Sequence, residues 1–320
     1  MSRISRYQDS VDKFFKTKSC IKSLSEENQN LIRLLNDEYS HINSIILLTT
    51  LNSQCKRYNL KLHGYYIASG IDILWLIVKI NDVIGYYNKL YGTSQISDLT
   101  NELILMVNYT LSQNIDSYYG IDPSRVLKIY QSCMNYLNTN IFNCVKASNF
   151  SSSKHIKKTE ITTYKFSNDE TLDKYRTLYL IPSDVLQQYI DQKYGTVCSL
   201  ALVLGWLLGM GDEKQVSELE KTGKYLGNIL KIAYDFKNIE RDILHSTGKI
   251  CKNTVVNWGV KDCFNKFVEN KARFIENLLK LGIYTTTIKE IVDIIEKDID
   301  NCINNTDITL NNDFSSYSSI

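Results

Sequence analysis

Proline is scarce in this sequence, with two residues among 320. Because proline breaks helices more strongly than any other residue, its scarcity permits long uninterrupted helices. Both prolines also stand where a helix is expected to begin. Pro123 follows Asp122, and Pro182 precedes Ser183 and Asp184, and each group is typical of a helix cap and first turn.

The sequence also lacks an excess of charge of either sign. Lys and Arg number 37 against 35 Asp and Glu, a net charge of +2, which excludes a broad cationic field for nucleic acid or anionic lipid. The eight cysteines contain no CxxC pair, which fits neither a zinc site nor a small disulfide scaffold. We therefore expect buried free thiols in a reducing compartment.

A signal peptide and a membrane span are not evident either. Residues 1–18 mix basic and acidic side chains without an apolar stretch, so we expect a cytoplasmic protein. The longest uncharged run, residues 194–211, contains four glycines and is short for a membrane span, so it predicts a buried core helix. The 43% apolar and 22% charged residues are ordinary for a globular protein and exclude a disordered or fibrous chain.

Apolar residues recur along the sequence at the spacing of α-helices, and the alternating pattern typical of strands is not found. The stretch 146–173 is polar and rich in Ser, Thr and Lys, so it predicts a long loop, and we expect a disordered tail over 304–320. We predict a single all-helical domain over residues 1–303. Its helices are predicted over residues 7–17, 26–37, 39–56, 61–90, 97–118, 123–146, 183–210, 216–245, 257–281 and 285–303.

Two of these helices carry the informative polar residues. Lys193 begins an otherwise apolar helix, and its neutral interpretation is a surface lysine whose stem covers apolar neighbours. Gly223 and Gly227, four residues apart, predict a close contact between helices. The same helix carries one polar stripe, whose neutral interpretation is a solvated face. The stripe consists of Lys231, Asp235, Asn238, Asp242 and His245.

Together these two helices resemble the trans-isoprenyl diphosphate synthases, the polyprenyl synthetase family. The family's corresponding helices read K-T-x-x-L-F-x-x-A-x-x-L-G and G-x-x-L-G-x-A-F-Q-I-x-D-D-x-x-D. The family's Gly-Lys pair further along the chain resembles Gly248 and Lys249. The residues that stand at the family's spacing are Lys193, Gly205, Gly223, Leu226, Gly227 and Ile232.

The sequence departs from this family at the aspartate-rich motifs. The second motif becomes Tyr234-Asp235-Phe236-Lys237-Asn238, and Lys231 replaces the glutamine one turn earlier. For the first motif two registers are open. The preferred one places Asp82 at the motif, with Asp72 in place of the family's glutamate, and the other uses residues 112–116. Either register keeps one aspartate, and the family's Arg-Arg segment is lost.

The resemblance implies an all-α, isoprenoid synthase-type helical bundle around a central cavity. Family enzymes hold Mg²⁺ ions between the two aspartate-rich motifs, and the ions neutralise the departing diphosphate. By resemblance, Lys193, Lys231 and Lys249 are candidates for diphosphate binding. Asp82, Asp235 and Asp242 are candidates for weak metal binding, so Mg²⁺ is expected to bind weakly. The ammonium of Lys231 could also replace a metal ion, and the neutral interpretation is a surface ion pair with Asp235.

The resemblance favours a divergent synthase-like protein that is catalytically impaired or inactive. Its role would be to bind a prenyl diphosphate or to act as a regulatory subunit in a homodimer or a heterodimer with a related synthase. An active prenyltransferase of the geranyl, farnesyl or geranylgeranyl diphosphate synthase kind, or a terpene-type lyase, is the alternative and would also use Glu240. A third interpretation is an unrelated helical interaction protein. Activity, ligand chain length and the partner stay open.

Overall fold

The computed structural model describes residues 3–35, 39–58, 60, 62–118, 120–145, 157–163 and 174–305, with the side chains of 34–35, 81–91, 157, 159–163, 174–176 and 305 left out. These residues form helices and one hairpin, which confirms the predicted all-helical fold class apart from the hairpin. The backbone contacts divide the chain into two compact units. The first comprises Met1–Ala147, Gln192–Gly227 and Phe274–Ile291, and the second comprises Ser148–Asp191, Asn228–Arg273 and Val292–Ile320. The single domain over 1–303 stays a prediction.

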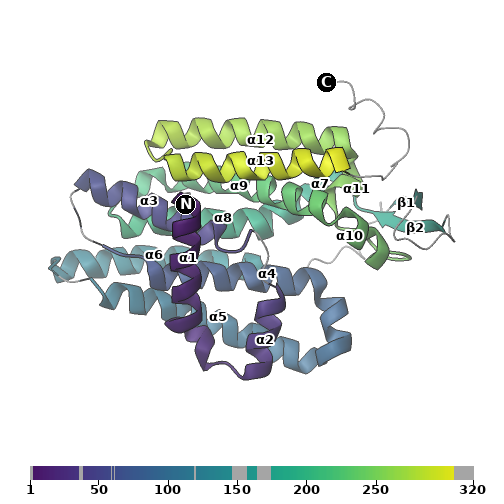
Figure 1. The fold of residues 1–320 in the computed structure, drawn as a ribbon. Coiled ribbons are helices and arrows are strands. Elements are labelled where there is room, and N and C mark those ends of the chain that lie inside the picture. The colour runs from purple at the N-terminus through teal and green to yellow at the C-terminus, as the bar shows by residue number, and fades with distance from the viewer. Residues whose placement is uncertain are drawn as a thin grey trace. The chain divides into compact units, whose positions relative to one another are not determined.

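The first unit is a helical bundle. Within it α4 packs most extensively on α5, and α8 packs on both α3 and α6. Figure 1 shows α4 and α5 running side by side. The unit contains α1 (Arg3–Thr17), α2 (Glu26–Leu35), α3 (Ile42–Tyr58), α4 (Tyr65–Tyr91), α5 (Thr93–Asp116), α6 (Pro123–Val145) and α8 (Thr196–Leu208), and the first part of α9 (Val216–Lys237).

Helix α8 forms the centre of this bundle. Each of its 13 residues is buried, which confirms the prediction of a buried core helix. A side chain at Gly205 would place its Cβ 2.5 Å from the carbonyl oxygen of Leu47 on α3. A side chain at Gly223 on α9 would lie 2.3 Å from the Cα of Ser199. Only glycine allows helices to approach this closely, so the predicted helix contact at Gly223 is confirmed.

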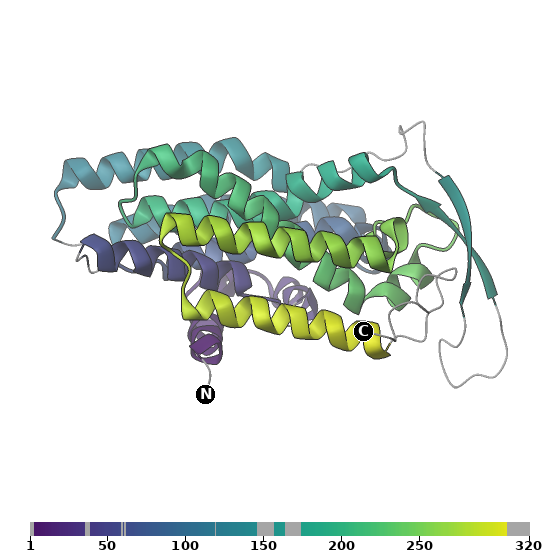
Figure 2. The ribbon, with the colours of Figure 1, turned by 90° about the horizontal axis from the view of Figure 1, so that it is seen from above.

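The second unit combines short helices with a hairpin. Strands β1 (Lys157–Thr163) and β2 (Lys174–Leu180) are antiparallel, and Lys157 pairs with Leu180. Figure 2 shows the two strands side by side. The unit also contains α7 (Ser183–Ile190), α10 (Ile239–His245), α11 (Thr254–Trp258), the end of α9, and parts of α12 (Val260–Leu281) and α13 (Thr286–Asn305).

The prediction of a loop over 146–173 is wrong at 157–163, where β1 forms. This segment, KKTEITT, is rich in β-branched residues but carries one apolar side chain, so the alternation that announces a strand is missing. Residues 146–156 and 164–173 lie outside the described residues. The predicted tail also begins later than expected, because α13 continues to Asn305, and residues 306–320 lie outside the described residues.

Two predicted helices are interrupted. The helix predicted over 183–210 contains a π-helical turn, Asp191–Gly195, between α7 and α8. The helix predicted over 216–245 divides at Asn238 into α9 and α10. The side-chain amide of Asn238 donates to the carbonyl oxygen of Tyr234 at 2.7 Å, and such bonding between a side chain and the backbone competes with helix continuation.

Two further expectations concern the cysteines and the membrane. All eight cysteines are free thiols, and six of them are buried as predicted, whereas Cys20 and Cys302 are partly exposed. Within the described parts of the chain, every helix is too short or too polar to cross a membrane.

Candidate functional site

Helix α9 carries a buried ion pair one turn from its end. The Nζ of Lys231 donates to Oδ1 of Asp235 at 2.6 Å. The two side chains are only 5% and 0% exposed, respectively. The neutral interpretation of this pair as a surface ion pair is therefore wrong. A buried pair also differs energetically from a surface pair, because loss of one partner leaves a charge without solvent or counterion.

Residues that follow α10 complete the surroundings of this pair. The backbone N–H of Thr254 donates to Oδ2 of Asp235 at 2.7 Å. The side-chain amide of Asn253 donates to the carbonyl oxygen of Asp235 at 2.9 Å and to Oδ2 of Asp242 at 3.0 Å. We call these five residues, Lys231, Asp235, Asp242, Asn253 and Thr254, the Asp235 cluster.

The fold of α11 fixes Asn253 in this position. Its Oδ1 caps the helix by accepting from the backbone N–H groups of Val255, at 2.9 Å, and Val256, at 3.3 Å. Asn253 is 1% exposed. Asn253 and Thr254 were not predicted as site residues from the sequence. Asn253 is a typical helix-capping residue that could have indicated a helix start at 254, but the helix was predicted to begin at 257.

Burial raises the pKa of Asp235 to about 6. The charge and hydrogen bond of Lys231 lower this pKa, the charge of Asp242 raises it, and the Thr254 N–H lowers it. Desolvation therefore outweighs the ion pair. Above this pH the buried pair holds the carboxylate of Asp235 against the ammonium of Lys231.

The cluster does not fit a magnesium site. Both carboxylate oxygens of Asp235 already accept hydrogen bonds, from Lys231 and Thr254. Asp242 accepts from Asn253 and, at 3.2 Å, from Nη2 of Arg241. Magnesium requires oxygen ligands that face it with near-octahedral geometry. Among the side chains that the structure describes, His, Cys, Asp and Glu nowhere gather in a group of three or more that could hold a metal ion.

Lys193 lies in the π-helical turn before α8, in the first unit. It is 2% exposed, so its interpretation as a surface lysine is wrong. Its charge lowers the pKa of Cys144, which burial raises to about 12. The turn packs tightly, because a Cβ at Gly227 would lie 2.4 Å from the backbone N of Gly195. The structure therefore holds a lysine side chain within an apolar part of the first unit.

The two remaining predicted site residues, Lys249 and Asp82, lie outside the Asp235 cluster. Lys249 is exposed, and its carbonyl oxygen accepts from the N–H of Tyr179 on β2 at 3.0 Å. The side chain of Asp82 lies outside the described side chains, although its backbone belongs to α4. Of the predicted site residues, the structure brings together Lys231, Asp235 and Asp242 in the second unit.

A second polar cluster lies in the first unit around Asp72, the residue at the position of the family's glutamate in the preferred register; its partners were not predicted from the sequence. Asp72 on α4 is 5% exposed and accepts from the hydroxyl of Ser44 at 2.5 Å. Nδ1 of His41 lies 2.7 Å from the other oxygen of Asp72. Burial lowers the pKa of His41, but Asp72 and then Asp12 raise it more, so the pKa lies above its usual value. In the alternative register, Asp116 is exposed.

Comparisons with known proteins bear on the fold. The sequence matches neither a protein-family model nor a curated protein. A geranyltransferase from Legionella pneumophila is similar in structure with a TM-score of 0.60 and 9% identity, over 93% of this chain and 96% of that one.

Two further solved structures agree with this likeness. An FPP/GFPP synthase from Zymomonas mobilis gives a TM-score of 0.55 and 11% identity, over 92% of this chain and 96% of that one. An isoprenoid synthase family member from Thermotoga neapolitana gives a TM-score of 0.52 and 12% identity, over 92% and 99%. This chain has the isoprenoid synthase fold.

Proposed function

We propose that the protein is a divergent isoprenyl diphosphate synthase-like protein that binds a prenyl diphosphate without a magnesium cluster and does not elongate it efficiently. The observation that carries this proposal is the buried pair of Lys231 and Asp235. By resemblance these residues occupy the positions of a neutral glutamine and a metal-binding aspartate. A protein ammonium therefore stands one turn from the carboxylate that would otherwise face a metal ion.

The chemistry of the reaction supports impaired catalysis. An allylic diphosphate ionises only when the departing diphosphate is neutralised, and divalent ions supply that charge in the resembling enzymes. Here Tyr234 and Asn238 stand where two motif carboxylates are expected, and the remaining one, Asp235, already binds a lysine and a backbone amide. Changes to groups around a metal commonly cost 10-fold to 100-fold in affinity or activity, so roughly this loss or more is expected for each.

Two buried lysines support anion binding in place of metal binding. Lys193 and Lys231 are both nearly inaccessible to solvent. A lysine ammonium binds phosphate as a compact point charge, and its attraction is stronger where water is excluded. We propose that Lys231 contributes to diphosphate binding in the second unit and that Lys249 of the same unit, which is exposed, contributes less, whereas Lys193 of the first unit stays a candidate by resemblance.

We also propose that the protein pairs with a second copy or with a related synthase subunit through α5 and α6. Large apolar side chains are exposed on these two helices. Large apolar side chains on a protein surface are often part of an interface. They are Leu105, Tyr109, Leu127 and Phe142, with exposures of 71%, 57%, 55% and 68%.

We also propose a cytoplasmic location, and the free thiols are consistent with it.

The binding proposal is tested by calorimetric titration of farnesyl diphosphate in EDTA. Wild-type protein should bind, and Lys231→Gln should bind at least about tenfold more weakly because a charge contact is lost. Lys221→Gln is the matched control, since Lys221 lies on the same helix with a 62% exposed side chain. The variant Lys231→Gln with Asp235→Asn, which keeps the pair neutral, guards against misfolding of the single variant.

Turnover separates this proposal from an active prenyltransferase. Labelled isopentenyl diphosphate, an allylic diphosphate and Mg²⁺ should give no elongated product. Efficient elongation would overturn the proposal and favour the alternative, in which Asp82, Asp235, Asp242 and Glu240 support catalysis. If wild-type protein and Lys231→Gln bind farnesyl diphosphate with equal affinity, Lys231 does not contribute to diphosphate binding.

A further inference from the structure

A polar pocket lies in the first unit between α1, α3 and the residues at the start of α13. Its volume is about 380 Å³. All the described side chains that line it are polar, and acidic residues are missing from that lining. A pocket of this size accommodates a small molecule, whereas pockets for apolar ligands are lined mostly by apolar side chains. This lining therefore does not suit a prenyl chain.

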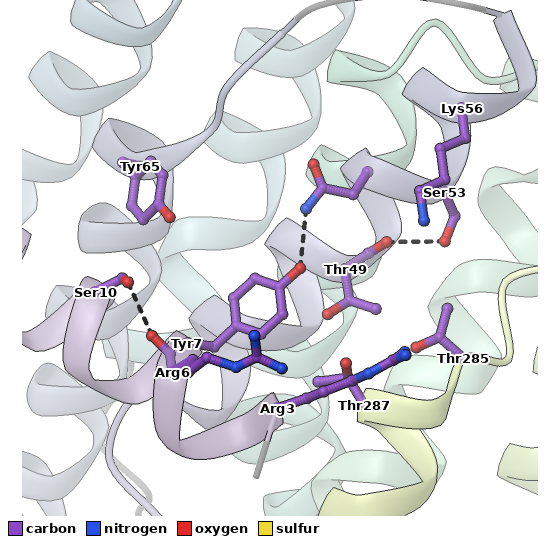
Figure 3. Close-up of a pocket in the computed structure, with 11 residues that line it drawn as sticks. Arg3, Arg6, Tyr7, Ser10, Thr49, Ser53, Lys56, Tyr65, Thr285 and Thr287 are labelled. Atoms are coloured by element: carbon purple, nitrogen blue, oxygen red, sulfur yellow. Dashed lines mark hydrogen bonds between the residues drawn. The ribbon is translucent and has the colours of Figure 1, made fainter. Parts of the chain in front are cut away.

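Three cationic side chains converge on this pocket. Arg3 extends from the first turn of α1 toward Thr285 and Thr287, Arg6 lines the pocket from the same turn, and Lys56 lies at the end of α3 (Figure 3). A guanidinium presents several N–H donors in a planar fork that matches the oxygens of phosphate, and arginine and lysine are the usual side chains for phosphate recognition. The charge of the lining favours an anion.

The buried wall of the pocket contains a hydroxyl that lacks a partner. Thr49 is 4% exposed, and its Oγ1 has no hydrogen-bond partner among the described residues. Figure 3 shows this side chain facing Tyr7. The phenol oxygen of Tyr7 accepts from the amide of Asn52 at 3.1 Å, so its own proton is free to be donated. Buried polar groups nearly always have partners, which makes these hydroxyls candidate donors to a ligand.

The nearest acidic side chain on α13 is already engaged. Oε2 of Glu290 accepts from the backbone N–H of Ile4 at 3.3 Å, in the first turn of α1. Glu290 does not line the pocket. It therefore satisfies a backbone group of α1 and leaves the guanidinium groups of Arg3 and Arg6 for the pocket.

We propose that this pocket is a second anion site, which binds the phosphate group of a small phosphorylated molecule. Arg3, Arg6 and Lys56 would neutralise the phosphate, and the hydroxyls of Thr49 and Tyr7 would donate to its oxygens. The site shares no residue with the Asp235 cluster, and it does not depend on the function proposed for that cluster.

Equilibrium dialysis with labelled inorganic phosphate, in EDTA, tests this site. Arg3→Gln with Arg6→Gln should weaken binding at least about tenfold, and Thr49→Val, which keeps the side-chain shape, should weaken it about threefold or more. Arg125→Gln with Lys128→Gln is the matched control, because both residues are exposed on α6 and lie outside the pocket. Thermal unfolding of each variant verifies that the fold is kept.

Three results would overturn the proposal. The first is equal phosphate binding by the Arg3 and Arg6 variant and by the α6 control. The second is loss of phosphate binding in Lys231→Gln, which would assign the anion to the Asp235 cluster instead. The third is binding to phosphatidic acid vesicles without binding to free phosphate, which would indicate a lipid surface as the partner. Loss confined to the pocket variants supports the proposal, whether or not farnesyl diphosphate binds elsewhere.

Discussion

Helix α8 and the Asp235 cluster show two opposite ways of filling a protein interior. Helix α8 is buried throughout with apolar and small side chains; its Gly205 allows a close approach to α3, and Gly223 of α9 allows a close approach of α9 to α8. The Asp235 cluster instead buries an ammonium and a carboxylate. Apolar packing stabilises a fold directly, whereas a buried ion pair is weak evidence for stability because its desolvation offsets its attraction. The proposed binding role of the cluster offers a reason for this costly burial.

The largest effect is expected from breaking the ion pair on one side. Lys231→Met leaves the carboxylate of Asp235 buried without its partner and should lower the free energy of unfolding by about 3–5 kcal/mol at neutral pH. Urea unfolding measures this, with Lys221→Met as the exposed control on the same helix. A loss equal to that of the control would contradict a buried pair.

The loss of stability in Lys231→Met is expected to depend on pH. The raised pKa of Asp235, about 6 in the folded protein, means that folding favours its protonated form. The unfolded chain releases this proton near pH 3.8, so between these values stability falls as pH rises. The cost of Lys231→Met should therefore shrink as the pH falls through about 6, because Asp235 then becomes neutral. A cost that grows on acidification would reverse the assigned sign.

A smaller effect is expected from crowding the apolar region. Gly205→Ala places a methyl group 2.5 Å from the carbonyl oxygen of Leu47 and should destabilise the protein by about 1–3 kcal/mol. Gln131→Ala, at an exposed position on α6, should change stability by less than about 0.5 kcal/mol. Equal melting temperatures for the two variants would show that α3 and α8 are not packed as closely as described.

Removing Asn253 tests how the cluster is held together. Asn253→Ala deletes a helix cap and two donors, and we expect a loss of about 1–3 kcal/mol. Asn270→Ala is a suitable control, since the amide of Asn270 donates within its own helix α12, to the carbonyl oxygen of Lys266. If the two variants unfold at the same denaturant concentration, Asn253 does not organise the cluster.

The smallest effect concerns His41 in the first unit. Its raised pKa means that the pairing with Asp72 stabilises the fold fully below the unfolded value of 6.5, and that this contribution is lost as pH rises through the folded value. His41→Gln should therefore cost more stability at about pH 5.5 than at about pH 8. If the cost is the same at both pH values, the protonation of His41 does not contribute to the stability of the fold.

The helical architecture could be predicted from the sequence because its signals are local. Pro123 opens α6, and α7 begins directly after Pro182. The apolar run over 194–211 becomes the buried helix α8, and Gly223 makes its predicted close contact. Periodicity and helix caps depend on neighbouring residues, so a single sequence contains them.

The candidate site could be predicted only in part because its burial is a tertiary property. Lys231 and Asp235 share a helix face, as predicted, but a polar stripe does not reveal that Asn253 and Thr254 fold over it. The π-helical turn that carries Lys193 likewise has no local signature. The hairpin was missed because polar side chains hide the strand pattern of β1.

The central claim is that a protein ammonium takes the place of a metal ion beside Asp235. Its most direct test is the affinity for farnesyl diphosphate measured across a titration of Mg²⁺, from EDTA to excess metal. The claim predicts binding in EDTA and an affinity that changes less than about threefold when Mg²⁺ is added. Binding that appears only when Mg²⁺ is present would contradict it.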